Sequence, residues 1–315
     1  MTSRRLAALA IGFGVMLVTI AGCGGGDDDD AGTDLSAPRA ADGFRIASFN
    51  FVESVLLAEM YAQVVESVGV PVVRLGEVGP REITMPALQN DLIDLVPEYL
   101  GTALDRAGSP APVPDTDAAL AELVDRLTPL GLTALDAAPA EDKNAVVVTA
   151  DTARAEGLAT ISDLGPIAST LRFGGPPECP DRPLCLVGLA DTYGLEFAEF
   201  VSQGSQSFTA ESLRRGEIDV GLMFSTNPSL ASADFVVLDD DRHLQPAENV
   251  VPVVRTDALD RWGPAVAMAL DAMSAELTTS TLQILNARVE TGRTIERVAN
   301  DWLESRGLGP PTEGG

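Results

Sequence analysis

The sequence is poor in the residues from which most catalytic and metal sites are built. Its 315 residues include one histidine, His243, and three cysteines, and aromatic residues make up 5% of the chain. It contains no Gly-x-Ser-x-Gly elbow, no His-Glu-x-x-His pair and no phosphate-binding glycine loop. A single imidazole with distant thiols makes neither a zinc site nor a catalytic triad. We therefore expect a protein that is not an enzyme and that holds no metal and no cofactor.

Basic residues are also scarce. The chain has 21 Lys and Arg against 47 Asp and Glu, which gives a formal net charge of −26. A surface this acidic repels phosphate groups, so we expect no binding to nucleic acid. The hydrophobic fraction of 45% is typical of a folded protein, and 315 residues are enough for two α/β lobes with their own cores.

The N-terminus carries an apolar run from Leu6 to Ile20, preceded by Arg4 and Arg5. This run is too short to span a bilayer comfortably, and the small residues that follow it are typical of a signal-peptidase site. We therefore expect residues 1–22 to be a signal peptide.

The residues Ile20-Ala21-Gly22-Cys23 resemble a bacterial lipobox, in which the cysteine is lipidated and becomes the first mature residue. An ordinary secretory leader with an incidental cysteine is the alternative. Residues 23–42 are rich in glycine and aspartate, which favours a flexible tether. The sequence thus predicts a protein on the extracytoplasmic face of the cell membrane, anchored through a lipid on Cys23.

Cys179 and Cys185 lie in a proline-rich stretch. In an exported protein, two cysteines this close are most simply a disulfide. We expect this structural bridge and not a redox-active pair, which is usually spaced more tightly and opens a helix.

Two stretches 125 residues apart follow one template, in which a leucine lies five residues before an Ile-Asp pair and an aromatic lies five residues after the aspartate. They are Leu88, Ile93-Asp94-Leu95, Tyr99 and Thr102, and Leu213, Ile218-Asp219-Val220, Phe224 and Asn227. The template reads as a helix end, a short strand and an aromatic at the exit of the strand. Because ligands bind outside the carboxyl ends of strands in open α/β sheets, the two aromatics are expected to face a cleft between two similar lobes.

Alternating strand and helix patterns along the rest of the chain predict largely parallel sheets covered by helices. The expected elements include strands at 92–96 and 218–224 and helices at 191–201 and 258–277. We expect lobe 1 to comprise residues 43–143 and 248–308, lobe 2 residues 144–247, and a tail residues 309–315. The chain then crosses between the lobes twice, which makes a hinge.

Several segments in order along the chain carry a family resemblance. They are Ile46-Ala47-Ser48 with Phe51 and Glu53, Pro97 to Leu104, Ala140 to Asn144, Ile161 to Leu164, Arg182 with Gly188-Leu189 and Tyr193-Gly194, Phe224 to Asn227, Leu238 to Asp240, and Asn249 with Pro252 to Arg255. Together they resemble the extracytoplasmic substrate-binding proteins of glycine betaine, carnitine and choline (osmoprotectant) ABC transporters. The resemblance implies a class II periplasmic-binding-protein-like α/β fold, with two lobes and a two-crossing hinge. It also implies a quaternary ammonium ligand held in a cage of aromatic faces, and a membrane permease as partner.

The resemblance also implies the residues of the site. Tyr99 and Thr102 match a cage tyrosine and a polar contact of the family, and Arg182 stands where an arginine binds the ligand carboxylate. Four positions depart from the family pattern: Phe49 replaces a lysine, Asn144 a cage aromatic, Phe224 a tyrosine and Glu248 another cage tyrosine. With Asn50, these residues form the expected ligand-binding set.

Because some aromatic positions of the cage are replaced, the identity of the ligand is not fixed by the resemblance. The loss of the lysine at Phe49 and the carboxylate of Glu248 favour a cation such as choline over zwitterionic betaine, unless Arg182 compensates. A different small solute in the same cleft is one alternative, and a secreted hydrolase or a surface interaction protein is another. We expect a monomer.

Overall fold

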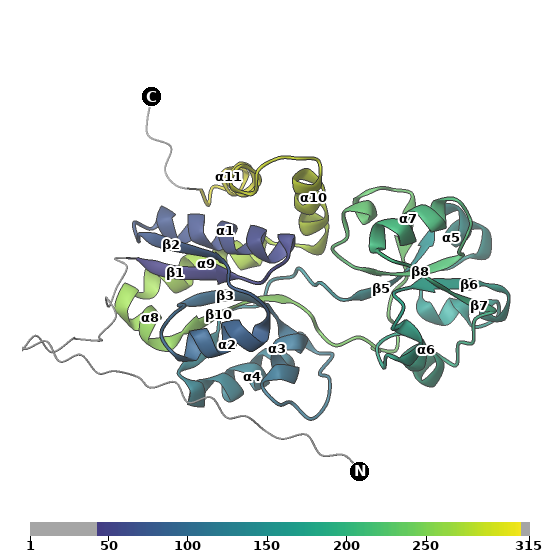
Figure 1. Cartoon of the computed structure of the whole chain (residues 1–315), viewed down its shortest axis with the longest axis horizontal. Coiled ribbons are helices and arrows are strands. Elements are labelled where there is room, and N and C mark those ends of the chain that lie inside the picture. Colours follow the sequence, from purple (N-terminus) through teal and green to yellow (C-terminus); the bar gives the residue numbers. More distant parts are fainter. Residues whose placement is uncertain (1–42, 310–315) are drawn as a thin grey trace, which may run out of the picture. The chain divides into compact units, whose positions relative to one another are not determined.

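The structure, a computed structural model, describes residues 43–309. These residues form two five-stranded mixed sheets flanked by helices (Figure 1). The sheet of the first lobe has the order β2-β1-β3-β10-β4. Its strands are β1 (Phe44–Ser48), β2 (Val72–Glu77), β3 (Leu95–Tyr99), β4 (Leu132–Ala134) and β10 (Val250–Arg255).

The sheet of the second lobe has the order β7-β6-β8-β5-β9. Its strands are β5 (Asn144–Thr149), β6 (Arg172–Gly175), β7 (Glu199–Ser202), β8 (Val220–Phe224) and β9 (Phe235–Val237).

The two sheets have the same topology. In the first lobe, β1 pairs in parallel with β2 and β3, and β10 is antiparallel to β3 and β4. In the second lobe, β6 takes the place of β1, and β5 takes the place of β10. This arrangement confirms the predicted α/β fold of two similar lobes.

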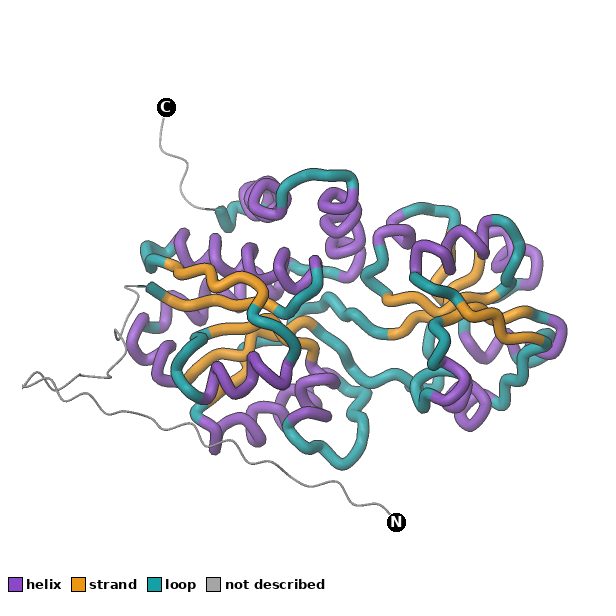
Figure 2. The backbone as a smooth tube through the Cα atoms, in the orientation of Figure 1, coloured by secondary structure: helices purple, strands orange, loops and turns teal. Residues whose placement is uncertain are grey.

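Helices cover both faces of the first sheet (Figure 2). Buried side chains of α1, α9, α10 and α11 form a core on one face, and those of α2, α3 and α4 form a core on the other. The helices are α1 (Val52–Ser67), α2 (Arg81–Gln89), α3 (Leu100–Arg106), α4 (Thr116–Leu127), α8 (Thr256–Trp262), α9 (Pro264–Glu276), α10 (Thr279–Glu290) and α11 (Ile295–Ser305).

The second lobe has a smaller set of helices and likewise two cores, one on each face of its sheet. Its helices are α5 (Ala150–Glu156), α6 (Leu186–Tyr193) and α7 (Gln206–Arg214). Within residues 43–309, no helix has the length and apolar character needed to cross a membrane. The predicted leader and Cys23 lie outside the described residues.

Two antiparallel segments connect the lobes, one entering β5 and the other entering β10 (Figure 1). They pair through a bridge between Glu141 and Asn249, and the backbone N–H of Asp142 donates to the carbonyl oxygen of Glu248 at 2.9 Å. The predicted two-crossing hinge is therefore present, and both crossings carry acidic side chains.

Two of the predicted helices are wrong in extent. Residues 191–201 were expected to form one helix, but α6 ends at Tyr193, before Gly194 at a φ of 69°, and Glu199 begins strand β7. Residues 258–277 are divided between α8 and α9 by Gly263, whose φ is 86°. In both cases a glycine with a positive φ ends a helix that the apolar pattern alone would continue.

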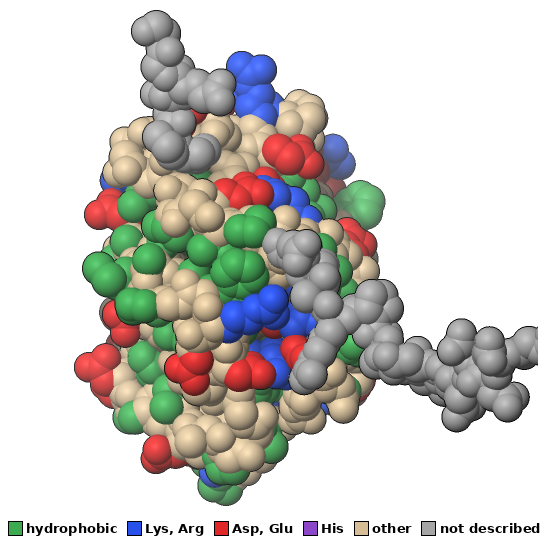
Figure 3. Space-filling model, turned by 90° about the vertical axis from the view of Figure 1, so that its left-hand side faces the viewer, with side chains coloured by type: hydrophobic (Ala, Val, Ile, Leu, Met, Phe, Trp, Pro, Cys, Tyr) green, Lys and Arg blue, Asp and Glu red, His purple; other side chains and the backbone are tan. Residues whose placement is uncertain are grey.

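The strand predicted at 92–96 begins later, at Leu95, because Asp94 has another role. The Asp94 carboxylate accepts hydrogen bonds from the backbone N–H of Arg45 at 2.8 Å and from its Nε at 3.0 Å. Figure 3 views the first lobe from this end and shows Lys and Arg side chains gathered on the face with Asp and Glu beside them. Ion pairs of Asp94 with Arg45 and Arg255 hold the strands together at this end of the sheet. Tyr99 lies at the other end of β3, where it lines the cleft.

Candidate ligand-binding cleft

A cavity of about 920 Å³ is lined by side chains of both lobes and of α10. Three of its aromatic side chains are Phe51, Tyr99 and Phe224. Tyr99 is the last residue of β3 and Phe224 the last residue of β8, so the template seen in the sequence places one aromatic in the cleft from each lobe.

The same local structure produces both placements. Asp219 precedes β8 as Asp94 precedes β3, and it accepts from the backbone N–H of Arg172 at 2.8 Å and from its Nε at 3.0 Å. Each aspartate thus fixes the start of a strand against the neighbouring strand, and five residues later the aromatic emerges at the carboxyl end. The predicted repeat is confirmed.

The aromatic rings present different amounts of surface. Tyr99 is 4% exposed, whereas Phe51 is 38% and Phe224 is 48% exposed. The rings of Phe51 and Tyr99 are tilted with their centroids 6.1 Å apart. Two large apolar rings that are exposed on opposite lobes and line one cavity are typical of a binding site.

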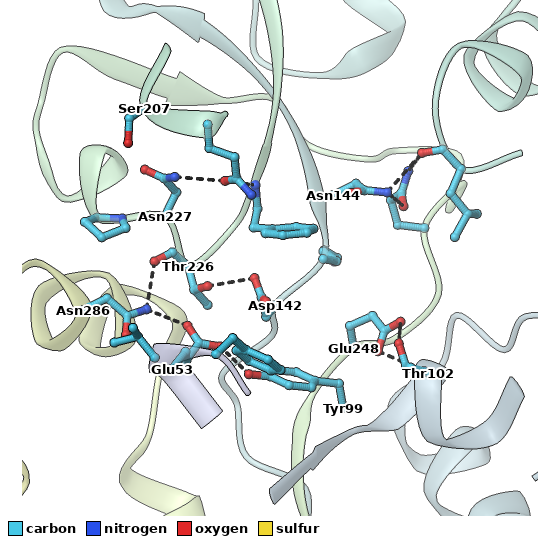
Figure 4. Close-up of a pocket in the computed structure, with 18 of the residues that line it drawn as sticks. Glu53, Tyr99, Thr102, Asp142, Asn144, Ser207, Thr226, Asn227, Glu248 and Asn286 are labelled. Carbon is cyan, nitrogen blue, oxygen red and sulfur yellow. Dashed lines mark hydrogen bonds between the residues drawn. The ribbon is translucent and has the colours of Figure 1, made fainter. Parts of the chain in front are cut away.

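The hydroxyl of Tyr99 begins a chain of hydrogen bonds across the cleft (Figure 4). It donates to Oε1 of Glu53 at 2.6 Å, and Nδ2 of Asn286 donates to Oε2 of Glu53 at 2.6 Å. The same Nδ2 also donates to the carbonyl oxygen of Thr226 at 3.2 Å. Burial and then the nearby Glu53 raise the pKa of Tyr99 well above its usual value, so its hydroxyl stays a donor.

Asp142 lies on the hinge crossing that enters β5, and it points toward the same centre (Figure 4). Its carboxylate accepts from the Thr226 hydroxyl at 2.7 Å. Burial and then the charge of Glu53 raise the pKa of Asp142 to about 7. Asp142 is therefore a half-buried carboxyl with one side-chain donor and a carboxylate neighbour, an arrangement that a positively charged ligand would stabilise.

Glu248 lies on the second crossing. Its two carboxylate oxygens accept from the backbone N–H of Thr102 at 3.0 Å and from the Thr102 hydroxyl at 2.9 Å. Burial raises the pKa of Glu248, and the hydrogen bonds from Thr102 oppose the rise. Thr102 and Glu248, both predicted as site residues, thus line the cleft as a hydrogen-bonded pair.

Arg81, on α2, is a basic side chain that lines the cleft. Its guanidinium lies 4.3 Å from the centroid of the Phe49 ring and 6.0 Å from that of Tyr99. Its Nε donates to Oε2 of Glu98 at 2.9 Å, and burial raises the pKa of Glu98 to about 7. The fully buried Phe49 therefore supports Arg81 from below and does not itself line the cavity.

The remaining predicted residues are divided. Asn144 lines the cleft and donates through Nδ2 to the carbonyl oxygen of Leu184 at 3.2 Å. Arg182 and Asn50 are exposed and are not among the cleft-lining residues. Arg182 lies in the loop between Cys179 and Cys185. This loop does reach the cleft, but through Leu184 and not through Arg182.

Cys179 and Cys185 form a disulfide, with their Cα atoms 5.3 Å apart. The residue before Cys185 is Leu184, whose carbonyl oxygen also accepts from Nε2 of Gln245 at 3.0 Å. The bridge therefore holds in place a loop that forms part of the cleft wall.

The cleft residues that were absent from the predicted set include Glu53, Arg81, Asp142 and Asn286. Glu53 and Asp142 lie inside segments that carried the family resemblance, so that signal was available. No sequence signal marked Arg81 or Asn286. They lie on α2 and α10, outside the segments that resembled the family.

Within residues 43–309, no three His, Cys, Asp or Glu side chains are grouped so as to hold a metal ion. The carboxylates of the cleft instead accept hydrogen bonds from Tyr99, Asn286, Thr226 and Thr102.

Comparison with known proteins places this cleft in context. A family model described as the substrate-binding domain of the ABC-type glycine betaine transport system matches residues 43–305. The glycine betaine-binding protein YehZ of Escherichia coli is 26% identical over 291 residues, covering 85% of this chain and 92% of that protein. A glycine-betaine-binding protein of Pseudomonas aeruginosa is 27% identical over 299 residues, covering 88% and 92%.

A crystal structure described as a glycine betaine/carnitine/choline ABC transporter has the same fold. It superposes with a TM-score of 0.79 at 24% sequence identity, covering 84% of this chain and 99% of the other.

Proposed function

Because the chain belongs to the family of substrate-binding domains of ABC-type glycine betaine transport systems, we propose that it captures a quaternary ammonium solute in its cleft and delivers it to a permease. Members of this family are solute-binding proteins of transporters. The candidate ligands are compounds of the choline, glycine betaine and carnitine type. The observation that carries the proposal is the meeting of aromatic faces with buried and half-buried carboxylates around one cavity.

Aromatic faces suit a trimethylammonium group because a large, weakly hydrated cation is attracted by the ring quadrupoles and is dehydrated at low cost. Phe51, Tyr99 and Phe224 offer such faces. The expected binding mode places the ammonium group between the rings of the two lobes.

The charges of the cleft favour a cation over a zwitterion. Glu53, Asp142 and Glu248 line it, and Arg182, which the sequence offered as the partner for a ligand carboxylate, does not. Arg81 and Lys143 also line the cleft, but Arg81 is already paired with Glu98 and Lys143 with Glu141. We therefore expect choline to bind more tightly than glycine betaine.

A ligand held between Tyr99 and Phe224 contacts both lobes at once and so stabilises their closed arrangement. We assign residues 43–143 with 248–308 to lobe 1, residues 144–247 to lobe 2 and residues 309–315 to a tail. The permease is expected to recognise this closed form of a monomer.

We further propose that the protein works outside the cytoplasm, on a lipid carried by Cys23. This assignment rests on the lipobox-like residues that precede Cys23. The test is membrane fractionation of Cys23→Ala against the wild type, with the mass of the wild-type N-terminus. A variant that stays in the membrane fraction, with no lipid on the wild-type N-terminus, contradicts the anchor.

Melting scans with choline, glycine betaine, carnitine and neutral polyols test the ligand. A ligand at about 100 times its dissociation constant adds about 2.7 kcal/mol to the free energy of unfolding, which a scan detects. Phe224→Ala should shrink the shift, while Phe208→Ala should leave it unchanged, because Phe208 is 65% exposed in the same lobe and does not line the cleft. A shift with a polyol and none with any ammonium compound would refute the quaternary ammonium ligand.

A further inference from the structure

A second cavity of about 310 Å³ adjoins the cleft. Four residues line both spaces: Thr102, Leu184, Pro246 and Glu248. The second cavity, here named the side chamber, is completed by α3 and by the loop of residues 109–113. The bonded pair of Glu248 and Thr102 thus stands at the border between the cleft and the side chamber.

The loop that walls the side chamber is fixed at both ends. The Ser109 hydroxyl contacts the carbonyl oxygen of Ala111 at 3.1 Å and Oε1 of Glu122 at 2.9 Å. The backbone N–H of Ala247 donates to the carbonyl oxygen of Val113 at 3.1 Å, and the side chain of Val113 packs on the core. The chamber is therefore formed before any ligand arrives.

Most polar side chains of the chamber already have partners. Arg106 pairs with Glu82 at 2.9 Å, Ser109 donates to Ala111 and to Glu122 on α4, and Thr102 donates to Glu248. The Asp105 carboxylate also lines the chamber and is exposed to solvent. Much of the remaining wall is carbon, contributed by Leu104, Pro110, Ala111, Pro112, Val113, Leu184 and Pro246. An occupant gains little there from new hydrogen bonds and gains most from burying apolar surface.

We propose that the side chamber receives an apolar tail of a quaternary ammonium ligand whose head lies in the cleft. The inference rests on the proposed function and names the substrate class: trimethylammonium compounds with an alkyl or acyl chain. The head contacts the aromatic rings, the chain passes the Glu248–Thr102 pair, and the tail lies against the loop of residues 109–113.

The size of the chamber sets the length of the tail. A volume of about 310 Å³ is many times the space that one water needs, and it accepts a chain of about four to six carbons. Choline has no such chain and leaves the chamber to water.

Titration calorimetry with choline and with ethyl-, butyl- and hexyltrimethylammonium tests the inference. Each methylene buried in the chamber should raise the affinity about fourfold, so butyl and hexyl compounds should bind progressively more tightly than ethyl. A flat series, in which choline binds and longer chains give no gain, overturns the side chamber and leaves the proposed function standing. Absence of binding by every compound overturns both.

Two matched variants test whether the gain in affinity with chain length arises in the side chamber. Ala111→Trp fills the chamber, so the ratio of the hexyl to the ethyl affinity should fall toward one. Ala118→Trp places the same side chain on the exposed surface of α4, away from both cavities, and should keep the wild-type ratio. A ratio that survives Ala111→Trp places the tail in the main cleft and refutes the proposal. Melting scans without ligand confirm that both variants are folded.

Discussion

Acidification should weaken the binding of a quaternary ammonium cation because it neutralises Asp142. Burial and the charge of Glu53 raise the pKa of Asp142 to about 7 in the unliganded protein. A bound cation favours the ionised carboxylate and so lowers this pKa. Above a pH of about 7 the carboxylate is already ionised, and the affinity should not depend on pH. Below it, each binding event must release a proton.

The magnitude follows from Coulomb's law. A cation about 5 Å from the carboxylate, at an effective dielectric constant of about 20, interacts with it by about 3 kcal/mol. This energy corresponds to a fall of about 2 units in the pKa of Asp142. The affinity should therefore fall almost tenfold per pH unit just below about pH 7, by about 50-fold at about pH 5 and by about 100-fold in all at lower pH.

The assay is calorimetric titration with tetramethylammonium, which has no titratable group. Repeating each titration in two buffers of different ionisation enthalpy counts the protons released. Asp142→Asn should bind weakly at every pH, and the wild-type affinity should fall to this flat level on acidification. Asp151→Asn is the matched control, because Asp151 is an exposed aspartate paired with Arg154 and lies outside the cleft. It should keep the wild-type profile.

The unliganded protein should respond to acid in the opposite direction. Asp142 and Glu98 both have a pKa of about 7 in the folded chain, above the values of the free side chains. The folded state therefore binds more protons than the unfolded state, so their contribution to stability is present at low pH and lost as the pH rises through about 7. Acidification from about pH 8 to about pH 5 should raise the melting temperature while the ligand-induced shift shrinks. Tight tetramethylammonium binding that is constant over this range would refute the placement of the cation beside Asp142.

Three further predictions concern two side chains of the cleft and the disulfide. Tyr99→Ala should weaken choline binding about 30-fold through loss of a desolvated cation–π face, and Tyr99→Phe should retain most of it, as titration calorimetry can measure. Glu248→Gln should weaken cations more than neutral solutes in melting scans, because the amide still accepts from Thr102 but carries no charge. Replacing Cys179 and Cys185 together by serine should cost about 2 kcal/mol in denaturant unfolding, and alkylation of both thiols in the unreduced wild type would contradict the bridge.

The sequence alone determined the repeated unit and, through it, the two aromatic positions of the cleft. Leu88, Asp94 and Tyr99 recur as Leu213, Asp219 and Phe224 because the unit is local: a helix ends, an aspartate holds the neighbouring strand, and an aromatic closes the next strand. Apolar residues that recur with a period of two in a strand or 3.6 in a helix reveal such local structure within a dozen residues.

The tertiary structure alone decided which polar groups complete the site. Asn286 meets Glu53 across 233 residues, and Arg81 lies against the Phe49 ring, where only the packing of α2 on the first sheet can place it. Arg182 lies only two residues before Leu184, yet Leu184 lines the cleft and Arg182 does not. Local patterns cannot report these facts, because the direction of a loop side chain and the meeting of distant helices depend on how the whole chain packs.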